Sequence, residues 1–326
     1  LVVGDDDQSI YGWRGAQVAN VMHFTRNFPD VKTIKLEQNY RSTGNILTAA
    51  NALIANNEDR MGKKLWTADE EGAPIALYSA FNEQDEARFV IEQIGEWLGK
   101  GRRAEEVAIV YRTTAQSRLF EEYLLRASIA YRVYGGQRFF ERAEIKDALA
   151  YLRLVQNPND DAAIERVINT PTRGIGQKTL STLRQQARAS SLPLWQAAEE
   201  CARQNLLPAR ALTAVQNFMQ IITGMRERMG DWTLGNQMQG VIEDSQLVSH
   251  YEKEPREKME SRVENLRELV NAAEAFILPT EDEEAGMTDL QSFLSHAALE
   301  AGETQGEAWD DCVQLMTLHS AKGLEF

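Results

Sequence analysis

Hydrophobic and polar positions follow two different periods along the first 135 residues. Short apolar runs typical of buried strands are separated by longer segments with helical spacing, such as Ala87, Val90, Ile91, Ile94 and Leu98. The pattern predicts strands at 33–38, 73–81, 105–112 and 131–135, and helices at 45–57, 83–99 and 115–128. Because strands and helices that take turns form a parallel sheet covered by helices, this part is predicted to be α/β.

The pattern changes after Gly136. From about 137 to 307 the apolar spacing is almost entirely helical, and a strand pattern returns at 311–320 (DCVQLMTLHS). A strand that resumes after a helical block predicts that the block is inserted between two strands of one sheet. The expected fold class is therefore α/β, a parallel-sheet domain interrupted by a large, mostly α-helical insertion.

Composition narrows the class of protein without naming a partner. The hydrophobic share of 43% is that of an ordinary soluble chain, and no apolar run approaches 18 residues, so no membrane partner is expected. Cys201 and Cys312 lie far apart, which fits a reducing, cytoplasmic setting. The net charge of −14 argues against nucleic acid, but residues 126–188 carry eleven Lys and Arg against six Asp and Glu.

The opening stretch, VVGDDDQSIYGWRGA (2–16), combines polar and aromatic residues after a strand-like start. Gln8 stands where a parallel strand would end, a place where α/β proteins hold ligands, and could hold a water or sense a phosphate. Tyr11 and Trp13 could stack on unpaired bases, and Arg14 could contact a backbone phosphate. The alternative is that both rings are core residues and the aspartates are solvated.

A second stretch, LEQNYRSTGNI (36–46), joins a predicted strand to a predicted helix that Ser42 and Thr43 can cap. Arg41 immediately precedes the helix N-terminus, a place suited to anions, and could stabilise charge on a transferred γ-phosphate. Tyr40 could stack on a purine. The alternative is an ion pair between Arg41 and a carboxylate such as Glu37.

Two further stretches carry candidate binding residues. In NTPTRGIGQKT (169–179) a Gly-Ile-Gly turn lies beside Arg173, Lys178 and Thr179, which suits duplex phosphates bound without reading sequence. The alternative is a simple helix-capping turn. In TLHSAKGLEF (317–326), His319 could contact a ligand and Glu325 could accept hydrogen bonds from a ribose, or the stretch is a strand followed by an exposed turn.

Five motifs occur together in a fixed order. They are GDDDQSIYGWRGA (4–16), LEQNYRST (36–43), YGGQRFFERAEIKD (134–147), NTPTRGIG (169–176) and LMTLHSAKGLEF (315–326). Together they closely resemble the UvrD/Rep/PcrA family of superfamily 1 DNA helicases, over essentially the whole chain. In such helicases two RecA-like domains clamp ATP between them and move 3′→5′ along single-stranded DNA.

The resemblance implies a division of the chain and a set of roles. Residues 1–36 would be the end of the first RecA-like domain, 37–134 with 309–326 an incomplete second one, and 135–308 a mobile inserted helical subdomain. The implied ATP site comprises Gln8 at the γ-phosphate, Tyr40 on adenine, Arg41 as the arginine finger and Glu325 on the ribose. Single-stranded DNA would meet Tyr11, Trp13, Arg14, Thr317 and His319. Duplex DNA would meet Thr172, Arg173, Gly174, Ile175, Gly176, Lys178 and Thr179.

Some motifs that the resemblance implies do not occur in this sequence. No GxxxxGK[ST] phosphate loop is present, and the acidic Mg²⁺-binding motif would lie before Leu1. The chain is therefore expected to be a fragment that alone neither hydrolyses ATP nor unwinds DNA, with no metal ligands of its own. The intact protein is expected to use ATP and Mg²⁺ and to meet DNA repair proteins. Alternatives are a Rep- or PcrA-like replication helicase and a non-catalytic DNA-binding or partner-docking protein on a helicase scaffold.

Overall fold

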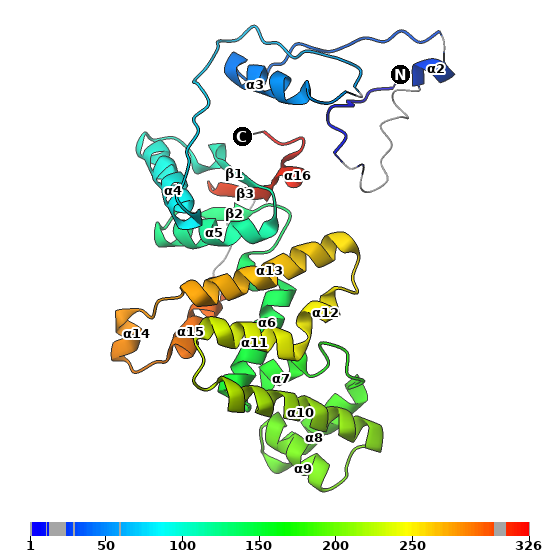
Figure 1. The fold of residues 1–326 in the computed structure, drawn as a ribbon, viewed down its shortest axis with the longest axis vertical. Helices are drawn as coiled ribbons and strands as arrows, with labels where there is room; N and C mark the ends of the chain where they lie inside the picture. Colours follow the sequence, from blue (N-terminus) through cyan, green and yellow to red (C-terminus); the bar gives the residue numbers. More distant parts are fainter. Residues whose placement is uncertain are drawn as a thin grey trace.

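A computed structural model describes residues 2–10, 12, 24–28, 30–58, 60–302 and 311–325. Three parts follow one another in Figure 1: an N-terminal segment (2–81), a sheet lobe (83–133 with 311–321) and a helical block (139–302). The N-terminal segment contains α2 (Phe24–Asn27) and α3 (Gly44–Ile54). No helix in the described part of the chain has the length and apolar character needed to cross a membrane.

The sheet lobe is a three-stranded parallel sheet with two long helices. Its elements are α4 (Glu83–Gly99), η2 (Ala104–Glu106), β1 (Ala108–Tyr111), η3 (Thr114–Gln116), α5 (Ser117–Arg126), β2 (Tyr131–Val133), β3 (Val313–Thr317) and α16 (Leu318–Ala321). The strand order is β1-β3-β2, so the last strand of the chain lies between the two earlier ones. The predicted insertion into one sheet is therefore confirmed.

Apolar side chains from both layers form the core of the sheet lobe. Ile91 and Ile94 of α4 and Leu124 of α5 are buried against the strand residues Val313 and Leu315. The helical spacing of the α4 residues and the alternation along the strands are those of the predicted α/β pattern. The fold class is α/β, with a RecA-like parallel sheet interrupted by a helical insertion.

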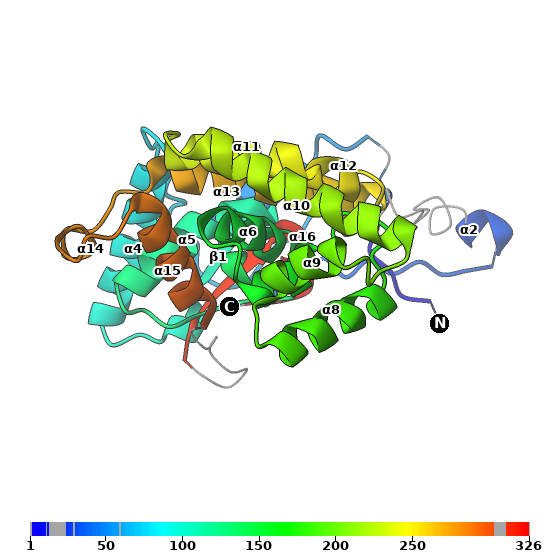
Figure 2. The ribbon, with the colours of Figure 1, turned by 90° about the horizontal axis from the view of Figure 1, so that it is seen from below.

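The helical block contains ten α-helices among the described residues, preceded by the turn η4 (Phe139–Glu141). They are α6 (Ala143–Gln156), α7 (Asp161–Val167), α8 (Gln177–Ser190), α9 (Leu194–Arg203), α10 (Ala209–Met229), α11 (Leu234–Ser245), α12 (Leu247–Tyr251), α13 (Arg256–Ala275), α14 (Thr280–Glu284) and α15 (Asp289–Gly302). Helix α6 runs through the middle of the block, with α13, α11 and α10 around it (Figures 1 and 2). Tyr151, Phe218 and Phe293 are almost completely buried there, so one continuous apolar core holds the block together.

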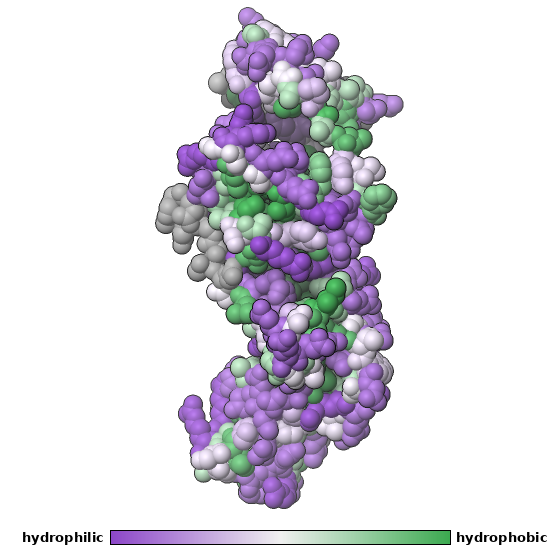
Figure 3. All heavy atoms as spheres, turned by 90° about the vertical axis from the view of Figure 1, so that its left-hand side faces the viewer, coloured by the Kyte–Doolittle hydropathy of each residue, from purple (hydrophilic) through white to green (hydrophobic). Residues whose placement is uncertain are grey.

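Two predicted strands do not form. Residues 33–38 make a single bridge, Gln38 to Trp66, and residues 73–81 make no strand. Their apolar side chains face solvent: Leu36 is 80% exposed and Leu77 96%. A strand is stable only where a neighbour satisfies its backbone groups and its apolar face is covered, and no described strand lies beside these two segments. On the face shown in Figure 3, hydrophobic residues cover more of the upper and middle parts than of the lower, helical end.

Buried polar groups join the sheet lobe to the helical block. Arg142 donates hydrogen bonds to Ser117 Oγ (2.7 Å) and to Asn265 Oδ1 (2.9 Å), and its guanidinium lies 3.6 Å from Glu121. Burial raises the pKa of Glu121, and the nearby Arg142 opposes that rise. Removing one member would leave a buried charge without its partner, so this network contributes to the contact between the block and the sheet lobe in this structure.

Candidate functional site

The structure brings together Arg41 and Glu325, two predicted ATP residues that lie 284 positions apart. Arg41 Nε and Glu325 Oε2 are 2.5 Å apart, with side chains 55% and 67% exposed. This contact is the ion pair with a carboxylate that was the alternative for Arg41, formed with Glu325 and not with Glu37, which accepts a hydrogen bond from the Lys64 N–H (2.9 Å). Exposed ion pairs add about 0–1 kcal/mol of stability, so this contact leaves both side chains available to a ligand.

Local turns set the position of Arg41. The side chain of Asn39 accepts hydrogen bonds from the Arg41 and Ser42 N–H groups (2.9 and 2.8 Å). Thr43 is the N-cap residue of α3, as predicted, but its side chain makes no capping bond; the carbonyls of Glu70 and Glu71 accept the first two helix N–H groups instead. The Tyr40 ring is 79% exposed and free to stack on a planar ligand.

The aspartate run beside Gln8, Asp5 to Asp7, forms ion pairs with Arg60 and Lys63 and is not simply solvated. Gln8 Nε2 donates to Asp5 Oδ2 (2.6 Å), and both oxygens of Asp7 accept from Arg60 (2.9 and 2.6 Å). The Arg60 hydrogen bond is the main cause that holds the pKa of Asp7 below its ordinary value. Lys63 pairs with Asp5 and lies 3.8 Å from Asp7.

The three aspartates also lie close enough to one another to be considered as metal ligands. One carboxylate oxygen from each of Asp5, Asp6 and Asp7 falls within 4.8 Å of the others. Arg60 and Lys63 already supply positive charge to this cluster, and Asp6 accepts the Met61 N–H (2.6 Å). These residues do not fit a metal site, and we assign none to them.

The residues predicted to bind single-stranded DNA lie in two parts of the chain. Tyr11, Trp13 and Arg14 lie outside the described residues. Thr317 ends β3 and caps α16, where its Oγ1 accepts the Ser320 N–H (3.2 Å), and the half-buried His319 follows it. Both stand at the carboxyl edge of the sheet, where parallel-sheet proteins hold ligands.

Two residues at the same edge were not predicted. Arg112 directly follows β1 and is exposed, and Tyr134 directly follows β2 and is 39% exposed. A side chain added at Gly135 would lie 3.8 Å from Ser320 Oγ, so the loop after β2 is next to α16. The signal that could have identified them is their place, at the carboxyl end of a predicted strand.

The Gly-Ile-Gly turn lies in the helical block, at the opposite end of the molecule from α3 (Figure 1). Arg173 is turned inward: it donates to Tyr151 Oη (2.6 Å) and to the Val167 and Pro171 carbonyls. Ile175 is buried. Thr172, Gly174, Gly176 and Lys178 are exposed and Thr179 is half-buried, and Gly176 caps α8 without a side-chain bond. Free N–H groups at this helix start suit an anion.

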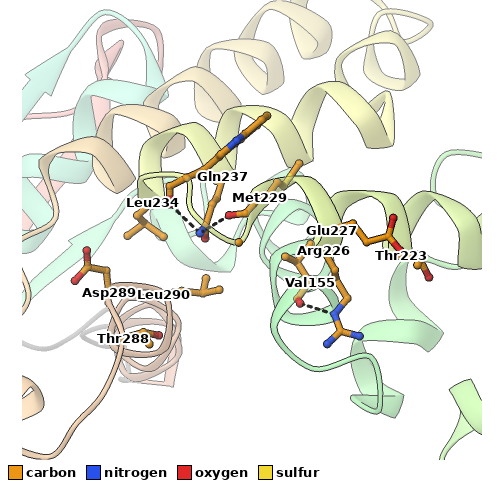
Figure 4. Close-up of a pocket in the computed structure, with 12 residues that line it drawn as sticks. Val155, Thr223, Arg226, Glu227, Met229, Leu234, Gln237, Thr288, Asp289 and Leu290 are labelled. Carbon is orange, nitrogen blue, oxygen red and sulfur yellow. Dashed lines mark hydrogen bonds between the residues drawn. The ribbon is translucent and has the colours of Figure 1, made fainter.

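A pocket of about 650 Å³ lies elsewhere, between α10, α11 and α15 (Figure 4). Its walls mix apolar residues with Arg226, Glu227 and Asp289. Gln237 donates to the carbonyls of Met229 and Trp232, both at 3.0 Å, and so fixes the loop after α10. None of the predicted site residues lines this pocket, so it is separate from the candidate site.

Comparison with known proteins agrees with the motifs. The model of the UvrD-like helicase C-terminal domain matches residues 34–326, and that of the UvrD/REP helicase N-terminal domain matches residues 1–29. The chain therefore belongs to the UvrD-like helicase family. Within it, the chain is 59% identical to DNA helicase II of Escherichia coli K12, 55% to DNA helicase II of Haemophilus influenzae and 39% to ATP-dependent DNA helicase PcrA of Bacillus subtilis.

Each of these similarities covers the whole of this chain but only part of the relative. The chain matches 45% of the Escherichia coli protein and 44% of each of the other two. It therefore spans less than half the length of the curated relatives it matches.

Proposed function

We propose that this chain is the central part of an ATP-dependent 3′→5′ DNA helicase that serves DNA repair. The observation that carries the proposal is the contact between Arg41 and Glu325, because two residues that the family resemblance assigns to one nucleotide meet across 284 positions. Family membership and the higher identity to DNA helicase II than to PcrA support the same reading.

In this proposal four side chains serve ATP, which supplies the free energy for movement. Tyr40 stacks on adenine, Glu325 accepts hydrogen bonds from the ribose, Gln8 senses the γ-phosphate and Arg41 stabilises charge on it. The exposure of Tyr40, Arg41 and Glu325 fits these roles, since none is needed for a core. We place no Mg²⁺ ligand on the described residues, because Arg60 and Lys63 neutralise the aspartate run.

DNA is proposed to bind at two separate surfaces. Single-stranded DNA would lie on Tyr11, Trp13 and Arg14 and along the carboxyl edge of the sheet at Thr317 and His319. Duplex DNA would meet the turn at 172–179, where the exposed start of α8 and Lys178 contact phosphates. Arg173 would stabilise the conformation of this turn from within the helical block, through its hydrogen bonds to Tyr151 and the Val167 carbonyl.

The division of the chain follows the same proposal. Residues 1–36 belong to a first RecA-like domain, 37–134 and 309–326 to a second, and 135–308 to a helical subdomain that changes position. Since the 326 residues contain no GxxxxGK[ST] loop, we propose that they do not turn over ATP by themselves.

The test is DNA-stimulated ATP hydrolysis and strand separation by the longer protein that contains this segment. Arg41→Ala should lower turnover about 10³-fold while nucleotide binding is mostly kept, because the arginine acts on charge that develops during transfer. Arg256→Ala is the matched control, since Arg256 also forms an exposed ion pair, with Glu260 at 2.7 Å. Absence of DNA-stimulated hydrolysis in the unmodified protein would favour a non-catalytic DNA-binding or partner-docking role instead.

A further inference from the structure

One seven-residue segment, 60–66, touches both parts of the proposed ATP site. We call it the strap. Its first half meets the aspartate run: Arg60 donates twice to Asp7, and Lys63 pairs with Asp5. These partners are 53 and 58 positions apart in sequence, so the contacts join two distant parts of the chain.

The second half of the strap meets the loop that carries Arg41. The Lys64 N–H donates to Glu37 Oε1 (2.9 Å), and the Trp66 N–H donates to the Glu37 carbonyl (3.0 Å). In return the Asn39 N–H donates to the Trp66 carbonyl (2.7 Å). Asn39 is the residue whose side chain holds the Arg41 N–H, so the strap sets the base of the Arg41 turn.

The strap is fixed along its length. The side chain of Asn51 on α3 both donates to the Leu65 carbonyl (2.8 Å) and accepts the Leu65 N–H (3.1 Å). The side chains of Arg60 and Asp7 are only 16% and 12% exposed, so their paired, charge-assisted bonds are partly shielded from water. A segment held at both ends and in the middle can transmit a displacement from one end to the other.

Gln8 is linked to the strap through Asp5. Lys63 contacts one oxygen of Asp5, and the other oxygen accepts a hydrogen bond from Gln8 Nε2 (2.6 Å). One N–H of the Gln8 amide is thereby engaged, and its second N–H and its carbonyl oxygen remain for a ligand. The direction of the amide therefore depends on where Lys63 holds Asp5.

We propose that Arg60 and Lys63 are positioning residues that couple Gln8 to Arg41 through the strap. They contact neither phosphate nor DNA in this account; they hold the γ-phosphate sensor and the arginine finger at a fixed separation. The inference rests on the proposed function, since it assigns a task to residues around that same site. The inference goes beyond the proposed function because it assigns the alignment of Gln8 and Arg41 to two cations, Arg60 and Lys63, on the strap.

The test measures kcat and KM for DNA-stimulated ATP hydrolysis in the longer protein. Arg60→Gln and Lys63→Gln should each lower kcat between about 10- and 100-fold, because misplaced groups lose transition-state contacts, while KM for ATP changes less than about threefold. Lys63→Arg keeps the cation and should retain most of the activity. Arg256→Gln, which breaks an exposed ion pair on α13, should change neither constant.

A charge swap separates coupling from loss of folding. The double variant Asp7→Arg with Arg60→Asp restores an opposite-charge pair and should recover at least about tenfold of the kcat lost in Arg60→Gln. An unchanged kcat in Arg60→Gln and Lys63→Gln, alongside a large loss in Arg41→Ala, would overturn the strap inference and leave the proposed function standing. An unmodified protein without DNA-stimulated hydrolysis would instead overturn the proposed function.

Discussion

The N-terminal segment and the helical block are held together in opposite ways. Within the described residues of the N-terminal segment, Leu47 is the one fully buried apolar side chain, and the contacts around the candidate ATP residues are ion pairs and hydrogen bonds. The helical block has a continuous apolar core that includes Tyr151, Phe218 and Phe293. The segment that carries the proposed nucleotide chemistry is thus the one with the least apolar support.

This difference has a physical meaning for function. Regions with few buried apolar contacts open at a low free-energy cost, and ligand-binding elements are drawn from that end of the stability range. Polar contacts such as the pair of Arg41 with Glu325 can be exchanged for contacts to a ligand with little net loss. The helical block, with its continuous apolar core, is expected to change less within itself.

The largest expected effect contrasts two phenylalanines. Phe218→Ala removes a ring that is 1% exposed in the helical block and should lower the free energy of unfolding by about 3–5 kcal/mol. Phe81→Ala removes a ring that is 98% exposed and should change it by less than about 0.5 kcal/mol. Urea unfolding of both variants measures the contrast. Equal losses would mean that the N-terminal segment has a core of its own.

A smaller effect is expected at Trp13, which lies outside the described residues. Trp13→Ala in the longer protein should weaken single-strand binding by about 1–3 kcal/mol through lost base stacking. Trp232→Ala is the control, because Trp232 is 42% exposed on the helical block and has no proposed DNA role. Fluorescence titration with an oligonucleotide gives both affinities. An unchanged affinity in Trp13→Ala would assign this ring to a core.

The smallest effect is a pH dependence that differs in sign between the two regions. The Glu300 carboxylate, 2.9 Å from His296, raises the pKa of that histidine above 6.5, against burial and Arg126. The contribution of protonated His296 to the stability of the folded state is complete below pH 6.5 and is lost as pH rises through the raised pKa. Asp7 has a lowered pKa, so its contribution is complete above pH 3.8 and is lost as pH falls below it.

Thermal unfolding midpoints, measured from the acidic range in which Asp7 titrates to the range in which His296 titrates, test both pH dependences. His296→Gln should remove a small decrease on the alkaline side, and Asp7→Asn a small decrease on the acidic side. Each substitution serves as the control for the other arm, since the two groups titrate in separate windows. An alkaline decrease that persists in His296→Gln would assign it to another group.

The sequence was sufficient for features set by local periodicity. Helix α4, the parallel strands and the insertion of the helical block followed from apolar spacing, because each element presents one face to a core. The strands expected at 33–38 and 73–81 were wrong, since apolar alternation cannot say whether a neighbouring strand is present. The family was identifiable because whole motifs, rather than single residues, carry the resemblance.

Contacts between residues that are far apart in sequence could not be predicted from hydrophobic periodicity. Nothing local in the sequence distinguishes Glu325 from Glu37 as the partner of Arg41, and nothing local turns Arg173 inward toward Tyr151. The contacts of Arg60 and Lys63 with the aspartate run were not predicted for the same reason, since the aspartates lie more than 50 positions away. Such pairings depend on how separate elements pack.

The contact of Arg41 with Glu325 can be tested most directly by the kinetics of its two members. In the longer protein, Arg41→Ala should lower kcat for DNA-stimulated ATP hydrolysis about 10³-fold with KM nearly unchanged. Glu325→Gln should raise KM for ATP by roughly tenfold with kcat nearly unchanged, because it weakens hydrogen bonds to a ribose. If both variants keep normal kinetics and lose at most about 1 kcal/mol of stability, the contact is an ordinary surface ion pair and the account is contradicted.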